Sequence, residues 1–156
     1  MAIELTPIGY VCSSRVDPID DAWDSVETRI ELADGVDAAA LDGLEDYSHV
    51  EVIFFFDQVA ESAIEHCARH PRGNTDWPRV GIFAQRAKNR PNRLGTTIVE
   101  LKAREGRVLH VLGLDAIDGT PVLDLKPVMV EFLPRTKVRQ PAWTHELMRE
   151  YWTTGQ

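Results

Sequence analysis

The 156-residue sequence predicts a mainly β protein, a small single-domain β-barrel with a few short peripheral helices. Short apolar or alternating segments recur along the chain between turn residues, which is typical of a barrel or a sandwich. No GxGxxG or GxxxxGK motif and no regular strand–helix alternation occurs, so a doubly wound Rossmann fold is not expected. The length suits one hydrophobic core, and no repeat or linker divides residues 1–156, so we expect one domain.

The first half of the chain predicts three strands, at 3–13, 26–32 and 49–57, and two short helices, at 37–43 and 60–70. The segment VETRIEL alternates, so Val26, Thr28, Ile30 and Leu32 share one face of a half-buried strand. Asp37 is a candidate N-cap of the first helix, and Pro71 ends the second. HVEVIFFFD is short, apolar and rich in β-branched and aromatic residues, which favours a central strand.

The second half predicts four strands joined by turns, at 80–85, 96–102, 107–115 and 122–134. A last helix is expected to begin at Pro141, since proline is tolerated in a first helical turn. Trp143, Leu147 and Tyr151 repeat every four residues and form one apolar face of this helix.

The charge of the chain is unevenly distributed. The formal net charge is -8, so non-specific binding to nucleic acid is not expected. Residues 69–93 nevertheless carry seven cations and a single acid, and such a local basic segment can bind an anion. The alternative is a solvated loop whose arginines pair with nearby acids.

Composition also predicts the cellular compartment of the protein. No apolar run is long enough to cross a bilayer, and the N-terminus lacks the basic start of a signal peptide. Two cysteines, Cys12 and Cys67, are too few for a disulfide framework, so a reduced, cytoplasmic protein is expected, with Cys12 in the core; one disulfide between them is the alternative.

Three segments carry candidate chemistry. In AQRAKNRPNRLGTT (84–97), Arg86 and Arg90 are able to converge on a carboxylate or phosphate, and Gly95 allows a positive φ; a hairpin loop with solvated arginines is the alternative. In GLDAIDGTP (113–121), Asp115 and Asp118 flank a turn and suit ribose hydroxyls or a cation, unless this is a plain hairpin. Polar Asp57 and Gln58 abruptly end an apolar strand, which is as consistent with a site lining as with a simple strand exit.

Other residues give weaker signals. His66 and His70 have helical i, i+4 spacing, but a third ligand is not evident, so no metal is expected. Among the tryptophans, only Trp23 lies in a polar stretch, where its ring is a candidate for stacking on a flat ligand. No GxSxG motif supports nucleophilic hydrolysis.

Taken together, IGYVCSS, GLEDYSHVEVIFFFDQ, VGIFAQRAKNRPNRLGTTIVEL and LHVLGLDAIDGTPVLDLKP occur in an order that resembles the TsaA-like (YaeB) family, over about residues 5–135. The resemblance implies a small β-barrel that binds S-adenosylmethionine and is usually a homodimer, with the cofactor near the subunit interface. It also implies methylation of N6 of threonylcarbamoyl-adenosine in the tRNA anticodon loop. A module that only binds the cofactor, or a methyltransferase with a non-tRNA acceptor, remains the alternative.

The resemblance assigns cofactor contacts but no catalytic residue. They are, in chain order, Pro18, Ile19, Asp20, Asp57, Gln58, Arg86, Thr96, Ile117, Asp118, Gly119 and Thr120. The remaining cations of the loop, Lys88, Arg90 and Arg93, are then candidates for binding RNA. Two positions depart from the family pattern, since Ala87 replaces a usual serine and Arg93 a usual proline.

Overall fold

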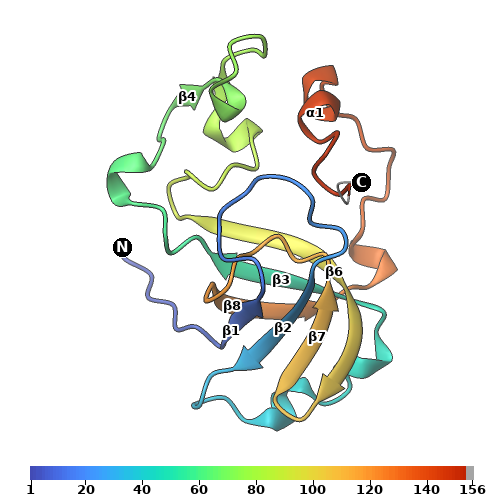
Figure 1. Ribbon diagram of the computed structural model, residues 1–156. Coiled ribbons are helices and arrows are strands. Elements are labelled where there is room, and N and C mark those ends of the chain that lie inside the picture. The colour runs from blue at the N-terminus through green and yellow to red at the C-terminus, as the bar shows by residue number, and fades with distance from the viewer. Residues whose placement is uncertain (154–156) are drawn as a thin grey trace.

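A closed antiparallel barrel of six strands dominates the computed structural model, which describes residues 1–153 (Figure 1). The strands follow one another around the barrel in the order β1-β2-β7-β6-β3-β8. Their bounds are β1 Gly9–Ser13, β2 Glu27–Leu32, β3 His49–Phe55, β6 Leu94–Glu105, β7 Val108–Leu112 and β8 Pro121–Pro127. The predicted mainly β barrel is therefore confirmed.

Alternation along the strands builds the core. In β2, Thr28, Ile30 and Leu32 are buried while the residues between them are exposed, as the sequence pattern predicts. The inward side chains of the other strands meet them, including the fully buried Phe54 and Leu109. Gly9 is required where β1 meets β2, since a Cβ there would lie 2.6 Å from the carbonyl oxygen of Glu31.

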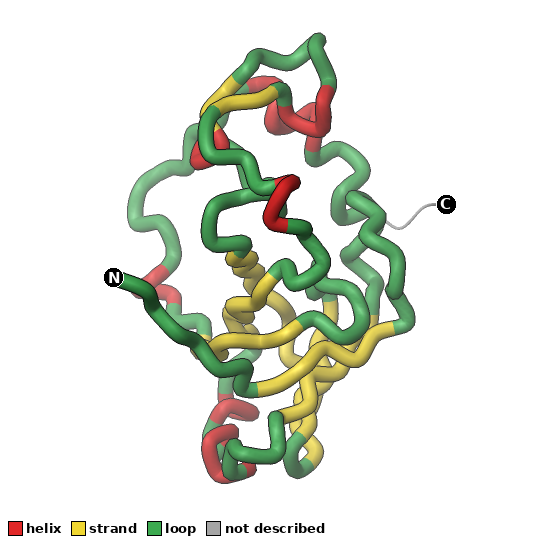
Figure 2. The backbone as a smooth tube through the Cα atoms, turned by 90° about the vertical axis from the view of Figure 1, so that its left-hand side faces the viewer, coloured by secondary structure: helices red, strands yellow, loops and turns green. Residues whose placement is uncertain are grey.

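Short elements surround the barrel (Figure 2). They are the 3₁₀ helices η1 Ala38–Leu41, η2 Leu44–Asp46, η3 Glu61–Ala63, η4 Pro71–Gly73, η5 Ile82–Ala84 and η6 Val130–Phe132, the two-stranded pair β4 Ala68–Arg69 and β5 Val80–Gly81, and the helix α1 Ala142–Leu147. The predicted cap of η1 is confirmed, since the Asp37 carboxylate accepts a hydrogen bond of 2.8 Å from the Ala39 amide.

Several predicted elements are wrong in type or length. Residues 60–70 form η3 and β4 rather than a helix, because the second half of this segment pairs with β5. The strands predicted at 3–13, 80–85 and 122–134 are shorter, as β1, β5 and β8 show, and the last helix ends at Leu147. Cys12 is half-buried rather than in the core, because its neighbour Val11 takes the inward position in β1.

One end of the barrel carries three of the connections between strands, including the longest, residues 56–93. Because all neighbouring strands are antiparallel, β1, β3 and β7 finish at the rim where β2, β6 and β8 begin. The connections 14–26, 56–93 and 113–120 therefore leave from this rim, which we call the loop end. The segment after α1 joins them, since Ala22 and Trp23 donate backbone hydrogen bonds to the carbonyls of Glu150 and Tyr151.

Candidate functional site at the loop end

The loop end receives the three segments that contain the predicted cofactor contacts. Pro18, Ile19 and Asp20 lie in connection 14–26, and residues 117–120 lie in connection 113–120. Asp57, Gln58 and Arg86 lie in connection 56–93, and Thr96 is the third residue of β6. Residues that are far apart in sequence thus share one rim of the barrel because of strand direction.

The turn at 117–120 is fixed to the end of β1. The Asp118 amide donates to the Arg15 carbonyl at 2.7 Å, and the Gly119 amide donates to the Val11 carbonyl at 2.8 Å. One carboxylate oxygen of Asp118 accepts a hydrogen bond from the Ser13 amide at 3.0 Å. Gly119 has a φ of 81°, which favours glycine. The Asp118 carboxylate is thus exposed on a turn whose backbone is held in place.

The connection 14–26 is organised around its own arginine. Arg15 lies over the Trp23 ring, 3.9 Å from its centroid, and donates to the carbonyls of Ile19, Asp21 and Ala22. The Trp23 indole nitrogen donates to the Asp20 carbonyl at 3.1 Å. Trp23 is only 4% exposed, so its predicted availability for stacking on a ligand is wrong; it supports the loop from inside.

The arginines of the basic loop have different surroundings. The exposed Arg86 donates to the Thr96 carbonyl at 2.6 Å. Arg90 donates to the Gln85 carbonyl at 2.8 Å, and Arg93 donates to the Val59 carbonyl at 2.8 Å and lies 4.7 Å from the Phe55 ring centroid. Arg90 and Arg93 thus use part of their guanidinium groups to hold the loop. For Lys88, no side-chain partner occurs among residues 1–153.

Gly95 and Arg93 show why this loop enters β6 as it does. Gly95 does not have the positive φ expected from the sequence. Glycine is needed there for close approach instead, because an added Cβ would lie 2.5 Å from the Phe54 ring. Arg93 has a φ of 51°, a value that the proline ring forbids. The backbone at this departure from the family pattern is therefore one that the usual proline does not permit.

Asp57 and Gln58 are both exposed just beyond the end of β3. The preceding residue, Phe56, donates its amide to the Arg93 carbonyl at 2.8 Å, which joins this strand end to the basic loop. The polar strand end and the start of β6 therefore lie side by side.

The sequence did not assign Tyr151 to the site. Its hydroxyl donates to one oxygen of the Asp115 carboxylate, and the Thr97 hydroxyl donates to the other. Burial, and next the negative charge of Asp115, raise the pKa of Tyr151, while the positive charge of Arg86 lowers it. The phenol therefore stays protonated and remains a donor. Its place on the predicted apolar helix face concealed this role, although the phenol hydroxyl gives tyrosine a polar end.

The histidines and cysteines do not form a metal-binding group in the described residues. Within residues 1–153, His, Cys, Asp and Glu do not gather into a group of three able to hold a metal. His70 contacts the Trp77 carbonyl through Nδ1 at 2.8 Å. Cys12 and Cys67 are free thiols, and burial raises the pKa of Cys12.

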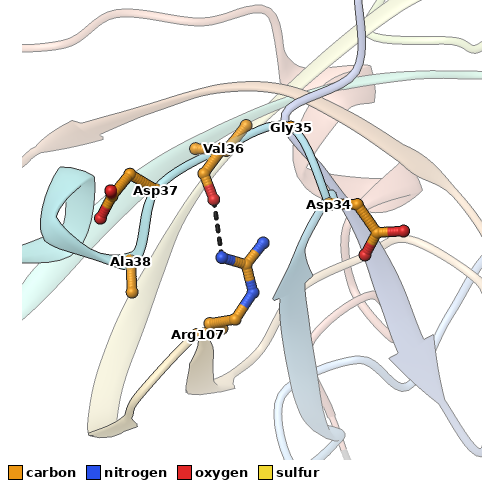
Figure 3. A pocket seen from close by; sticks show the side chains of 6 residues that line it. All are labelled: Asp34, Gly35, Val36, Asp37, Ala38 and Arg107. Atoms are coloured by element: carbon orange, nitrogen blue, oxygen red, sulfur yellow. Dashed lines mark hydrogen bonds between the residues drawn. The ribbon is translucent and has the colours of Figure 1, made fainter.

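A hollow lies away from the loop end, beside the turn that joins β6 and β7 (Figure 3). Arg107 enters it and donates to the carbonyls of Val36 and Ala33, at 2.7 and 2.6 Å. The guanidinium group thus fastens the segment after β2 to the barrel, and we assign this hollow a structural role.

Among the helices of the described residues, we find none with the length and apolar character of a membrane span.

Comparison with known proteins identifies the family. Residues 17–132 match the tRNA-methyltransferase O N-terminal domain. The chain is 37% identical over 135 residues to a putative S-adenosylmethionine-dependent methyltransferase, RcsF, of Pseudomonas aeruginosa, covering 81% of this chain and 57% of that protein. It is 41% identical to the tRNA (adenine(37)-N6)-methyltransferase of Escherichia coli, over 62% of this chain and 43% of that enzyme.

Two further similarities cover more of the chain. A probable S-adenosyl-L-methionine-binding protein of Pyrococcus abyssi is 32% identical over 85% of this chain and 72% of its own length. A crystal structure of TrmO from Pseudomonas aeruginosa superposes with a TM-score of 0.74 at 30% identity, over 92% of this chain and 62% of that one. The chain thus spans only part of several relatives, and it belongs to the tRNA-methyltransferase O N-terminal domain family.

Proposed function

We propose that the protein is an S-adenosylmethionine-dependent methyltransferase that methylates N6 of threonylcarbamoyl-adenosine in the anticodon loop of tRNA. The observation that carries the proposal is the convergence of the predicted cofactor residues at the loop end of a barrel of this family. The Escherichia coli relative, a tRNA (adenine(37)-N6)-methyltransferase, supplies the acceptor class. Work on tRNA is consistent with a cytoplasmic location.

The residues at the loop end fit the chemical groups of S-adenosylmethionine. Arg86 is exposed, and only one of its guanidinium nitrogens has a partner in the described residues, so it is suited to the methionine carboxylate. Asp118 presents an exposed carboxylate, the usual partner of ribose hydroxyls, on a turn fixed to β1. Pro18, Ile19, Asp20, Asp57 and Gln58 are all exposed at the same end of the barrel.

The reaction mainly requires that the protein orient the methyl donor and the acceptor. The cofactor supplies a methyl group on a sulfonium, which is already a strong donor. The acceptor nitrogen would form a bond to that methyl group while the sulfur–methyl bond breaks, leaving its electron pair on a neutral thioether, and the nitrogen would lose a proton to water. The protein must therefore hold donor and acceptor in line. An adenine is reached only where it is unstacked or flipped out, as in a loop. A turn and a loop with fixed backbones are suited to this task.

Incubation with labelled S-adenosylmethionine and bulk tRNA, followed by nucleoside analysis, tests the proposal. Label in a modified adenosine is expected. Tight cofactor binding without transfer to any nucleoside would contradict the proposed activity and favour the binding module, a function suggested by the name of the Pyrococcus abyssi relative. Label in a protein or small molecule would favour a different acceptor.

The basic loop gives a prediction about RNA. Lys88→Ala is expected to weaken tRNA binding and to flatten its logarithmic salt dependence by about 0.7–0.9, the loss of one phosphate contact. Lys88 is preferred to Arg90 and Arg93, whose replacement would also release the carbonyls they hold. The measurement is tRNA titration at several salt concentrations.

Lys102→Ala is the matched control for Lys88→Ala. Lys102 is exposed, lies in the part of β6 that pairs with β7, and forms an ion pair of 3.1 Å with Glu100. The Lys102→Ala variant makes the same change in net charge at a position outside the basic loop. An equal salt dependence of tRNA binding for Lys88→Ala and wild type would show that Lys88 does not contact the RNA.

We also propose a homodimer. Beyond the resemblance to a family of homodimers, the segment after β8 exposes Val130 to 77% and Phe132 to 86%. Exposed apolar side chains grouped in this way are typical of an interface. Light scattering at micromolar concentration is expected to give twice the chain mass of 17.6 kDa. A mass of one chain would contradict the dimer.

A further inference from the structure

Tyr151 contacts, directly or through one neighbour, three of the segments that carry the proposed cofactor residues. Its carbonyl accepts a hydrogen bond of 2.9 Å from the amide of Trp23, in connection 14–26. Its hydroxyl donates to Asp115, in connection 113–120. Asp115 in turn accepts from Thr97 of β6. The barrel places these loops at the same rim, and these hydrogen bonds join them to one another.

The network continues to the proposed ligand contacts. The Thr96 carbonyl, one residue before Thr97, holds Arg86. The Trp23 indole holds the Asp20 carbonyl, while Asp118 lies three residues beyond Asp115. The charges of Arg86 and Asp20 both reach the Tyr151 hydroxyl, where they shift its pKa in opposite directions after burial and Asp115 have raised it. The Tyr151 side chain is half-buried at this end of the barrel.

The segment that carries Tyr151 is held at a second place. The Trp77 indole nitrogen donates to the Glu146 carboxylate at 2.9 Å, and the Trp77 and Trp143 rings lie 6.4 Å apart. Residues 142–151 thus extend from the tip of connection 56–93 to Asp115. They lie outside residues 17–132, which match the family domain.

We propose that Tyr151 is a positioning residue of the cofactor site, which acts through Asp115 to fix the loops that bind S-adenosylmethionine. This inference rests on the proposed function, which identifies the ligand as S-adenosylmethionine. The half-buried Asp115 carboxylate is shared by two hydroxyl donors. Loss of one donor lets the carboxylate rotate and lets connection 113–120 move. Because Tyr151 holds residues that bind ligand, its loss should speed cofactor release more than it slows cofactor capture.

Tyr151→Phe tests the proposal because it removes the hydroxyl and keeps the ring. Cofactor affinity is expected to fall by up to about tenfold, mainly through faster dissociation in stopped-flow measurements, because a hydrogen bond to a charged group, worth at least about 1.5 kcal/mol, no longer holds the loops in place. Asp115→Asn should have a comparable effect. If Tyr151 acts through Asp115, the double variant should bind no more weakly than Asp115→Asn alone.

The control is Tyr47→Phe, a tyrosine beside the hollow between η2 and β8, at the other end of β3. It should leave the dissociation rate unchanged. Equal dissociation rates for Tyr151→Phe and wild type, or additive losses in the double variant, would overturn the proposal. A drop in thermal midpoint with unchanged binding kinetics would assign Tyr151 a purely structural role and would overturn it as well.

Hydrogen exchange separates this inference from the proposed function. In the protein without ligand, the Trp23 amide should exchange faster in Tyr151→Phe, because the segment that supplies its acceptor is less firmly held. If the wild type binds no S-adenosylmethionine, the proposed function is wrong. Faster exchange at Trp23 would then still support the network, and unchanged exchange would overturn it.

Discussion

Arg86→Ala is expected to weaken binding of S-adenosylmethionine roughly ten- to hundredfold, whether or not RNA is present. A hydrogen bond to a charged group contributes about 1.5–3 kcal/mol, and Arg86 is the exposed cation held beside the start of β6. Arg86→Lys should be intermediate, because it keeps the charge and loses the planar fork that matches a carboxylate. Calorimetric titration of the cofactor measures all three affinities.

Arg79→Ala provides the matched control. Arg79 is exposed in the same basic segment, and no side-chain partner of it occurs in the part of the chain that the structure covers. It removes the same charge from a different part of connection 56–93, so its cofactor affinity should equal that of wild type. If both variants lose affinity equally, Arg86 attracts the ligand only as part of a diffuse field. If neither loses affinity, the proposed contact is wrong. A chelator should change none of these affinities.

The barrel was predictable because each of its strands carries a local signal. Alternation in residues 26–32 and the apolar run at 49–57 reflect burial on one face, which depends on neighbours in sequence. Strand closure was not predictable, since β1 meets β8 through only two register pairs, at Gly9 and Tyr10. The prediction for residues 60–70 was wrong because a segment long enough for helical turns before Pro71 does not show that part of it pairs with another strand, β5.

The candidate site, like the fold, was predictable only where local sequence carries the signal. Arg86, Asp57 and Asp118 follow strands or turns that the sequence marks, and strand direction brings them to one end. The roles of Arg90 and Arg93 were hidden, because their carbonyl acceptors are backbone groups of Gln85 and Val59. Tyr151 was hidden for a different reason. Its partner Asp115 lies 36 residues earlier, and only tertiary packing joins them.

Phe54→Ala is expected to have the largest effect on stability. The Phe54 ring is 1% exposed in the barrel core and meets the Phe56 ring edge to face, with centroids 5.3 Å apart. Replacing a buried phenylalanine by alanine costs about 3–5 kcal/mol of unfolding free energy, a large part of the 5–15 kcal/mol typical of a domain. Urea unfolding measures the loss. Phe83→Ala removes a ring that is 76% exposed and should change stability by less than about 0.5 kcal/mol.

A double-mutant cycle with Gly95 identifies the contact responsible. Gly95→Ala alone should destabilise the barrel, because its Cβ would lie 2.5 Å from one carbon of the Phe54 ring and 2.6 Å from another. In the Phe54→Ala background the clash with the Phe54 ring is absent and the contact with the Phe56 ring, at 2.9 Å, remains, so the added cost of Gly95→Ala should fall without vanishing. Additive losses would show that the two positions do not share this contact. Since Gly95 directly precedes Thr96, whose carbonyl holds Arg86, the single Gly95→Ala variant should also bind S-adenosylmethionine more weakly than a folded Phe83→Ala control.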